Sequence, residues 1–222
     1  MEKFGSTSHW QGFVVTQVPD ILSMVLSTWE KFPSPFSDEL EDPVTNRFCV
    51  ALKRARDRCD LPFRIDVQLV ELDLDAGEEQ GRMDIVFSPP APREDIYFCL
   101  ECKRVNVVTA KGRRACYSEY VVHGMLRFVQ GQYAQKVQNG AMVAYVLDGD
   151  CQRAIAGIEG NLTINATALR MAGSPVFATS VLFPSDHRVK ETLHNRTFGT
   201  EQFKIHHLFL AVSPTSKFRD VS

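Results

Sequence analysis

Hydrophobic and polar positions follow two spacings along the chain, and together they predict helices and strands in a definite order. Apolar residues recur at helical spacing over 19–32 and 43–59, where Asp20 and Asp42 are the expected N-caps. Apolar runs of strand length occupy 63–75, 82–87, 96–105, 141–147, 174–183 and 206–212. Helical spacing returns over 113–137 and over 148–162, the latter with Asp148 or Asp150 as its cap. This order predicts an α/β fold with a mixed central sheet flanked by helices.

The length of 222 residues is enough for one well-buried domain and too short for two of ordinary size. We expect residues 1–37 to form an N-terminal accessory segment and residues 38–222 to form a single domain. Within it, 39–147 would be the core, with the order helix, three strands in a meander, helix and strand. Residues 148–222 would be a strand-rich C-terminal extension.

Composition narrows the class of protein. Hydrophobic residues make up 44% and charged residues 23% of the chain, as is usual for soluble globular proteins. No run approaches the 18 to 20 apolar residues that a membrane span needs, and the N-terminus lacks the pattern of a signal peptide. We therefore expect a cytoplasmic protein with no membrane partner and with its six cysteines as free thiols.

The net charge of −2 gives no sign of a nucleic-acid partner, but the basic residues are unevenly spread. Five of them and no acid lie between positions 103 and 114: Lys103, Arg104, Lys111, Arg113 and Arg114. Taken alone, such a cluster favours a solvated surface. Next to a site that handles phosphates, the same residues would neutralise a nucleic-acid backbone.

Charged residues interrupt the apolar strand pattern in the stretch "DIYFCLECKRVNV". A hairpin whose loop is centred near residues 92 and 93 would pair Val86 with Cys99 and place Asp84 opposite Glu101. Asp84, Glu101 and Lys103 would then share one face. The other face would be wholly apolar, with Met83, Ile85, Phe87, Phe98, Leu100 and Cys102.

Two carboxylates that project from neighbouring strands, with Cβ atoms about 5 Å apart, repel each other unless a cation lies between them. An all-oxygen site favours Mg²⁺ or Mn²⁺, and Lys103 beside it could hold an attacking water and offset charge on a phosphate. The alternative is a structural cluster in which Lys103 is the ion-pair partner of two surface acids.

The segments "GRMDIVF" and "YFCLECKR" resemble the D, E-x-K signature of the PD-(D/E)xK, or restriction-endonuclease-like, nuclease superfamily. Met83 stands where the name of the signature has proline. The predicted order of elements over 39–147 resembles the common core of that superfamily. The resemblance implies metal ligation by Asp84, Glu101 and the carbonyl of Cys102, with Lys103 as the catalytic lysine.

The same resemblance implies supporting residues outside the two strands. A glutamate on the first core helix would be catalytic; we expect Glu41, with Glu39 as the second candidate, although an acid there also favours the helix dipole. On the helix after the third strand, Gln130, Gln132 and Tyr133 could contact the site, or the tyrosine could be core and the glutamines solvated.

The function implied is a Mg²⁺-dependent (or Mn²⁺-dependent) endonuclease that hydrolyses DNA. The segments "YVVHGMLRFVQGQYA" and "GAMVAYVLDGD" are also similar to small bacterial antiphage-defence proteins. We therefore expect an effector or subunit that acts with partner subunits or as a homo-oligomer. One alternative is a catalytically inactive nuclease-fold protein that binds nucleic acid or serves as a scaffold. Another is a site-specific restriction endonuclease.

Overall fold

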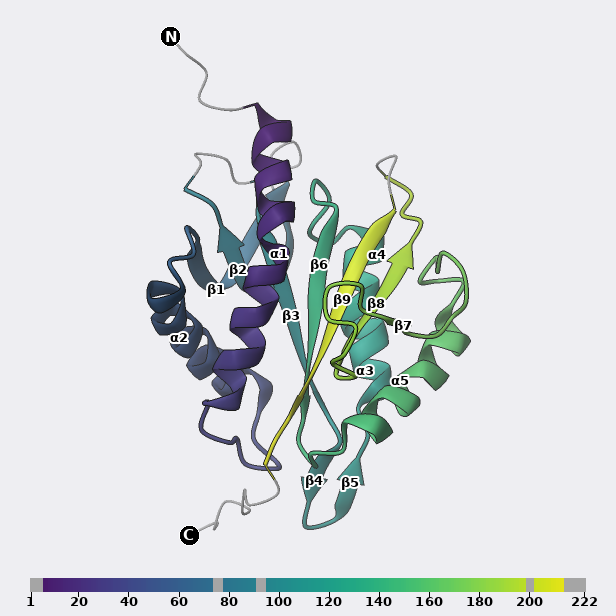
Figure 1. The fold of residues 1–222 in the computed structure, drawn as a ribbon. Helices are drawn as coiled ribbons and strands as arrows, with labels where there is room; N and C mark the ends of the chain where they lie inside the picture. Colours follow the sequence, from purple (N-terminus) through teal and green to yellow (C-terminus); the bar gives the residue numbers. More distant parts are fainter. Residues whose placement is uncertain (1–5, 74–77, 91–94, 199–201, 214–222) are drawn as a thin grey trace.

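The computed structural model describes residues 6–73, 78–90, 95–198 and 202–213, and its elements follow the predicted α/β order (Figure 1). The helices are α1 (Thr7–Glu30), α2 (Glu41–Cys59), α3 (Tyr117–Tyr120), the π-helix η1 (Val121–Met125), α4 (Leu126–Gln130) and α5 (Cys151–Asn165). The strands are β1 (Arg64–Asp73), β2 (Glu78–Ser88), β3 (Phe98–Val105), β4 (Val107–Thr109), β5 (Gly112–Arg114), β6 (Asn139–Val146), β7 (Ala178–Thr179), β8 (Val189–His194) and β9 (Phe203–Ala211).

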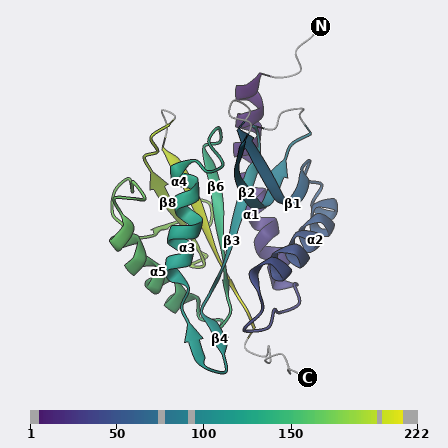
Figure 2. The same ribbon diagram turned by 180° about the vertical axis from the view of Figure 1, so that it is seen from behind.

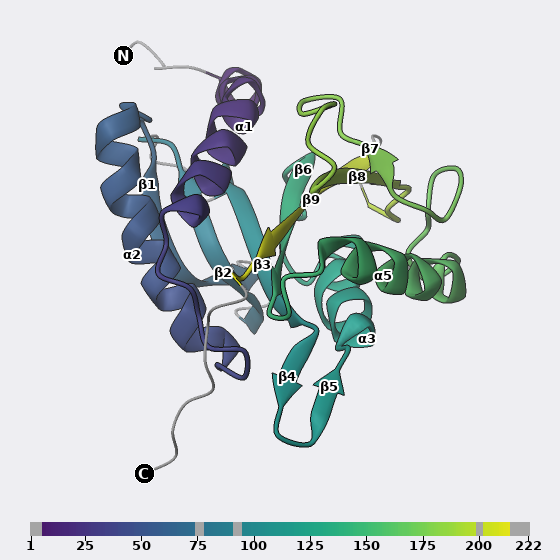
Figure 3. The same ribbon diagram turned by 60° about the horizontal axis from the view of Figure 1, so that its bottom comes forward.

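One mixed sheet runs through the centre of the molecule. Its strand order is β1-β2-β3-β6-β9-β8-β7, in which β3, β6 and β9 are parallel neighbours and the other pairs are antiparallel. Helices α1 and α2 cover one face of the sheet, and α3, α4 and α5 cover the other (Figures 1 and 2). Strands β4 and β5 form a separate hairpin that projects beyond the end of the sheet (Figure 3).

The sheet separates two hydrophobic cores. The core beneath α1 and α2 includes Trp29, whose ring stacks on Tyr145 at 5.3 Å and whose indole N–H donates to the carbonyl of Ala211 at 2.8 Å. The second core lies beneath α3 to α5 and includes Phe128 and Phe209. The segment expected to be accessory therefore supplies a helix that packs directly on the sheet.

Helix α1 is longer than the sequence pattern indicated. It begins at Thr7 with Ser6 as its N-cap, so the expected cap at Asp20 is wrong. Pro19 lies inside the helix, where it removes one backbone hydrogen bond. The helix continues through this proline because residues on both sides of it, Val14 and Ile21 among them, are buried against the sheet.

Helix α2 also begins earlier, at Glu41, and Leu40 occupies the N-cap position with no side-chain cap bond. Asp42 is therefore in the first turn and is not the cap. In α5, Asp150 is the N-cap as expected, and its carboxylate accepts from the N–H of Arg153 at 2.9 Å. Within the described ranges, every helix is too short or too polar to cross a lipid bilayer.

Two further segments differ from the prediction. The helix expected over 113–137 is confined to 117–130, because 112–114 pair as β5 and Gly131 ends α4 in a left-handed conformation (φ 72°). The strand expected over 174–183 shrinks to Ala178–Thr179. Strand β8, with the sequence VKETLH, was not predicted, because its buried positions include polar residues.

Candidate functional site

Strands β2 and β3 separate at the position where their charged residues begin. They pair through Ile85 with Leu100, Val86 with Cys99 and Phe87 with Phe98, which confirms the predicted register at Val86. At Asp84 the ladder has ended, and the carboxylate Oδ2 accepts the N–H of Cys102 at 2.7 Å. The Asp84 side chain thus takes the place of a backbone–backbone hydrogen bond between β2 and β3. We call the place where the two strands separate, next to Asp84 and Cys102, the fork.

The neighbouring strand β1 is irregular at the same level. Val67 pairs with Ile85 in the core beneath α1 and α2, whereas Leu69 pairs with Met83 and both contact the opposite core. The residue between them, Gln68, has a left-handed φ of 54°. Between Ile85 and Met83 the inward side chains of β2 switch from one face of the sheet to the other. The prediction that Met83 lies on the same face as Ile85 is therefore wrong. The other five residues expected on that apolar face do pack together.

The ammonium of Lys103 lies at the centre of the fork, between oxygens from three elements. Its Nζ is 2.8 Å from Glu101 Oε1, 3.0 Å from Glu41 Oε1 on α2, and 4.0 Å from Asp84 Oδ2 on β2. It also donates to the carbonyl oxygen of Cys102 at 2.9 Å. The structure therefore brings together Asp84, Glu101, Lys103, Glu41 and the Cys102 carbonyl.

Glu101 is the most deeply buried acid of the cluster, with 1% of its side chain exposed. Its Oε2 accepts from the hydroxyl of Tyr133 at 2.7 Å, and its Oε1 also accepts from Arg127 Nη1 at 3.1 Å. Tyr133 thus reaches the cluster, whereas the side chains of Gln130 and Gln132 are exposed. Arg127 was missed in the sequence, where the only signal for it was that a buried carboxylate needs several donors.

The two candidate glutamates at the start of α2 have different surroundings. Glu41 bridges β3, because its second oxygen, Oε2, accepts the backbone N–H of Arg104 at 3.0 Å. Glu39 is turned away and buried; its carboxylate binds the Arg47 guanidinium at both oxygens and the N–H of Phe36 at 3.2 Å. Of the two candidates, Glu41 joins the cluster and Glu39 stabilises the loop that leads into α2.

Electrostatics set the protonation states of the cluster. Burial, together with the charge of Glu101, raises the pKa of Asp84 to about 7, although Lys103 and the N–H of Cys102 act in the opposite direction. Burial lowers the pKa of Lys103, but the surrounding carboxylates outweigh it and the pKa lies above its ordinary value. The amine therefore stays charged at neutral pH, while Asp84 changes charge close to neutrality.

The predicted phosphate-binding residues lie beyond the end of β3. Lys111, Arg113 and Arg114 are exposed on the β4–β5 hairpin (Figure 3). Arg114 pairs with Glu119 at 2.5 Å, and the guanidinium of Arg113 donates to Asn106 Oδ1 at 2.8 Å. The guanidinium of Arg104 is held closer to the fork, since it donates to the Glu39 carbonyl at 2.7 Å.

A divalent metal ion is a second kind of cation that these oxygens could bind. Among the described residues, no group of three or more histidine, cysteine, aspartate or glutamate side chains is already arranged as metal ligands. The oxygens of Glu101, Cys102 and Glu41 instead surround the ammonium of Lys103. Carboxylate and carbonyl oxygens are the donors that Mg²⁺ and Mn²⁺ prefer, so the donor set fits if the ammonium leaves its central position.

Comparison with known proteins adds no relative. No protein-family model, no curated protein and no solved structure matches the chain. What is established is an α/β protein with a mixed central sheet and a cluster of three carboxylates around a lysine. Any functional conclusion therefore depends on the chemistry of that cluster.

Proposed function

We propose that this chain is a metal-dependent nuclease of the PD-(D/E)xK class that hydrolyses phosphodiester bonds in DNA. The observation that carries the proposal is the convergence of Asp84, Glu101, Glu41 and the Cys102 carbonyl on one cation, the ammonium of Lys103. Three acids gathered around one point destabilise a fold unless a cation is present. Such a cluster is typical of a site that binds cations.

The order of elements supports the same class. Helix α2, the meander β1-β2-β3, the helical segment 117–130 and β6 follow one another as in a restriction-endonuclease-like core. The two acids lie where that core has them, with Asp84 on the second strand of the meander and Glu101 on the third.

Each residue of the cluster has a role in this proposal. Asp84, Glu101 and the carbonyl of Cys102 would hold Mg²⁺ or Mn²⁺. The bound ion would supply Lewis-acid chemistry, which favours the attack of water on a phosphate. Lys103 would donate hydrogen bonds to the attacking water and to the phosphate oxygens, and would offset the charge that develops on them. Glu41 would keep the ammonium within reach of the fork.

The β4–β5 hairpin suits the backbone of a nucleic acid. Its exposed cations follow β3, the strand that carries Glu101 and Lys103, and in this proposal a phosphate backbone bound at the fork extends along them. These contacts carry no sequence information by themselves. The resemblance of "YVVHGMLRFVQGQYA" and "GAMVAYVLDGD" to antiphage-defence proteins extends the proposal to bacterial defence against foreign DNA in the cytoplasm, with targeting supplied by partner subunits or by self-assembly.

Plasmid cleavage tests the proposal. Supercoiled plasmid is incubated with the chain in Mg²⁺ or in EDTA, and Asp84→Asn and Lys103→Met are compared with the wild type. We expect Mg²⁺-dependent nicking by the wild type and a loss of about 100-fold or more in each variant. Asp66→Asn is the matched control, because Asp66 lies on the neighbouring strand β1 and pairs with Arg64 outside the cluster.

The outcomes separate the competing functions. Cleavage by Asp84→Asn at the wild-type rate would contradict the site. If the wild type cleaves nothing with any divalent ion, alone or with co-purified partners, the fold serves as a nucleic-acid-binding or scaffold subunit. Fragments that share one defined end sequence would indicate a site-specific restriction endonuclease.

The phosphate contacts have a test of their own in binding that does not require cleavage. Replacement of Lys111 by glutamine should reduce the slope of log binding constant against log salt concentration by about 1. Lys136→Gln, an exposed lysine in the segment before β6, should leave the slope unchanged. An unchanged slope in Lys111→Gln would remove the hairpin from the proposed DNA path.

A further inference from the structure

A groove opens between α1 and strands β9 and β8, on the face of the sheet opposite Glu101. Figure 1 shows how these three elements are arranged. Its volume is about 490 Å³, which lies in the range of sites that hold small molecules. The α1 wall is aliphatic, with Val15, Val18 and Pro19, and Leu182 faces it from the loop after β7. Two of these side chains are exposed although apolar: Val15 by 41% and Leu182 by 36%.

Polar side chains form the floor of the groove. Asn139, Lys204 and Leu193 lie side by side on β6, β9 and β8, because Lys204 is paired with both of the others in the sheet. His206 lies in the next row on the same face, two residues along β9. Aliphatic walls therefore stand over a floor that offers an amide, an ammonium and an imidazole.

His206 has hydrogen-bonding capacity that the described residues do not use. Its side chain lines the groove, the residue is 3% exposed, and Nδ1 has no hydrogen-bond partner among the described residues. Burial, and in addition the charge of Lys204, lowers the pKa of His206 to about 4, so the ring is neutral at pH 7. A buried polar atom without a partner is costly, and Nδ1 itself is covered by protein, so His206 contributes a neutral ring to the floor of the groove.

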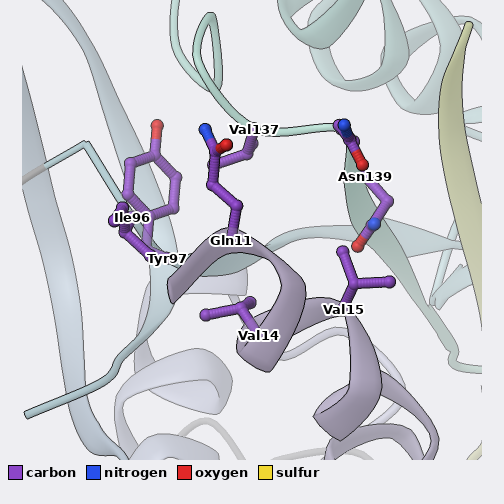
Figure 4. A pocket seen from close by; sticks show the side chains of 8 residues that line it. Gln11, Val14, Val15, Ile96, Tyr97, Val137 and Asn139 are labelled. Carbon is purple, nitrogen blue, oxygen red and sulfur yellow. The ribbon is translucent and has the colours of Figure 1, made fainter. Parts of the chain in front are cut away.

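A proline stands in the α1 wall of the groove. Pro19 has no N–H to donate to the carbonyl of Val15, one helical turn earlier, and both residues line the groove. Figure 4 views the adjoining hollow, which shares Val15 and Asn139 with the groove.

Charge determines the kind of ligand. Lys204 is the one charged side chain among the described residues that line the groove. Its Nζ is only loosely paired, at 3.5 Å from Glu191 Oε1, so it can still donate to a second anion. The described lining contains no phenyl, phenol or indole ring on which a nucleobase could stack, and its apolar part is aliphatic.

We propose that this groove binds a small amphipathic carboxylate, with the carboxylate at Lys204 and Asn139 and the aliphatic body between α1 and Leu182. The amide groups of the lining orient the polar end, while burial of the aliphatic body covers the exposed Val15 and Leu182 side chains. The site is independent of the proposed nuclease centre, since its floor is the opposite face of the sheet.

Titration calorimetry with decanoate tests the site in the full chain, without metal or DNA. We expect saturable binding of decanoate at one site. Decanol, which has the same chain but no charge, should bind with an affinity lower by a factor of about ten or more. Val15→Glu should weaken decanoate binding at least tenfold, because it places a carboxylate on the apolar wall. Val50→Glu is the matched control, since Val50 is an exposed valine of α2 outside the groove, and it should bind as the wild type does.

A second variant removes the charge. Lys204→Met should abolish the preference for decanoate over decanol, whereas Lys190→Met, on the other face of β8, should retain it. The proposal is overturned if the wild type shows no saturable binding, if decanol binds as tightly as decanoate, or if Val15→Glu binds as the wild type does. Because the assay contains no nucleic acid, its failure leaves the nuclease proposal untouched, and loss of cleavage would not affect it.

Discussion

A buried chain of hydrogen bonds joins α3, β9 and β8, and its direction follows from its last acceptor. The Tyr120 hydroxyl is 2.8 Å from His207 Nδ1, and Thr192 Oγ1 is 2.8 Å from both His207 Nε2 and His194 Nε2. His194 Nδ1 is 2.7 Å from the carbonyl oxygen of Leu169. Since a carbonyl only accepts, His194 donates through Nδ1. Burial lowers the pKa of both His194 and His207, so the rings are neutral at pH 7. Nε2 of the neutral His194 then accepts from Thr192, and each preceding bond runs the same way.

This chain predicts a loss of stability in mild acid. Burial lowers the pKa of His194 to about 4; the bond to Leu169 opposes this shift and the charge of Arg196 adds to it. As the pH falls, the unfolded chain, with a histidine pKa of 6.5, takes up the proton before the folded chain does. The contribution of His194 to the free energy of unfolding is therefore fully present above pH 6.5 and is lost as the pH drops from 6.5 to 4. From pH 8 to pH 5, His194 alone should cost about 2 kcal/mol.

Replacement of His194 by glutamine isolates this contribution. The amide can donate to Leu169 and accept from Thr192, but it cannot gain a proton. In urea titrations at pH 8 and pH 5, the free energy of unfolding should fall by about 2 kcal/mol less in His194→Gln than in the wild type. His123→Gln is the control, because His123 is exposed on η1 and should keep the wild-type dependence.

The measurement can refute the reasoning directly. If the wild type and His194→Gln lose the same free energy between pH 8 and pH 5, the buried ring does not resist protonation. The pKa of His194 in the folded chain would then lie close to its ordinary value, and burial and Arg196 would not lower it. His207 faces the same test: burial, together with His194 and His206, lowers its pKa well below the ordinary value.

Two further changes test packing and the candidate site. In α5, Gly157→Ala would place Cβ 1.9 Å from the Tyr117 ring and should lower the free energy of unfolding by about 1 to 3 kcal/mol. Gly160→Ala, whose Cβ would have nothing within 4 Å, should raise the free energy of unfolding by about 0.5 to 1 kcal/mol. Urea titration checks both, and effects of the same sign would contradict this account. Tyr133→Phe removes the donor to Glu101 Oε2 and should cost about 1 to 3 kcal/mol at pH 8, so wild-type stability in thermal melts would show that this bond contributes nothing.

Local pattern was sufficient where a residue and its neighbours decide the structure. The alternation of strand residues put Glu101 and Lys103 on one face, and the structure brings both to the fork. Asp84 was expected there from a symmetric hairpin, and the register at Val86 agrees. The three strand residues needed only the geometry of one element or of two consecutive strands. Glu41 followed instead from the resemblance to the nuclease superfamily, which implies a glutamate on the first core helix.

Long-range contacts decided what the pattern did not reveal. Strand β8 is polar in sequence, yet Thr192 and His194 are buried because their hydrogen-bond partners come from β9 and from the segment after α5. Met83 changed sides because a neighbouring strand is irregular at Gln68. Arg127 on α4 and Glu101 on β3 are 26 positions apart in the sequence, and only the packing of the helix against the sheet brings them together.

The sequence by itself determined the α/β order, the strands β1, β2, β3, β6 and β9, and the acid and lysine positions, because periodicity and charge are local properties. The tertiary structure decided that Lys103 lies between the carboxylates of Asp84, Glu101 and Glu41, which belong to three different elements. It also decided that α1 and β9 enclose a groove. Both arrangements require segments that are distant in the sequence to pack against each other. The free energy that stabilises them comes from contacts between elements, which the pattern of one segment does not reveal.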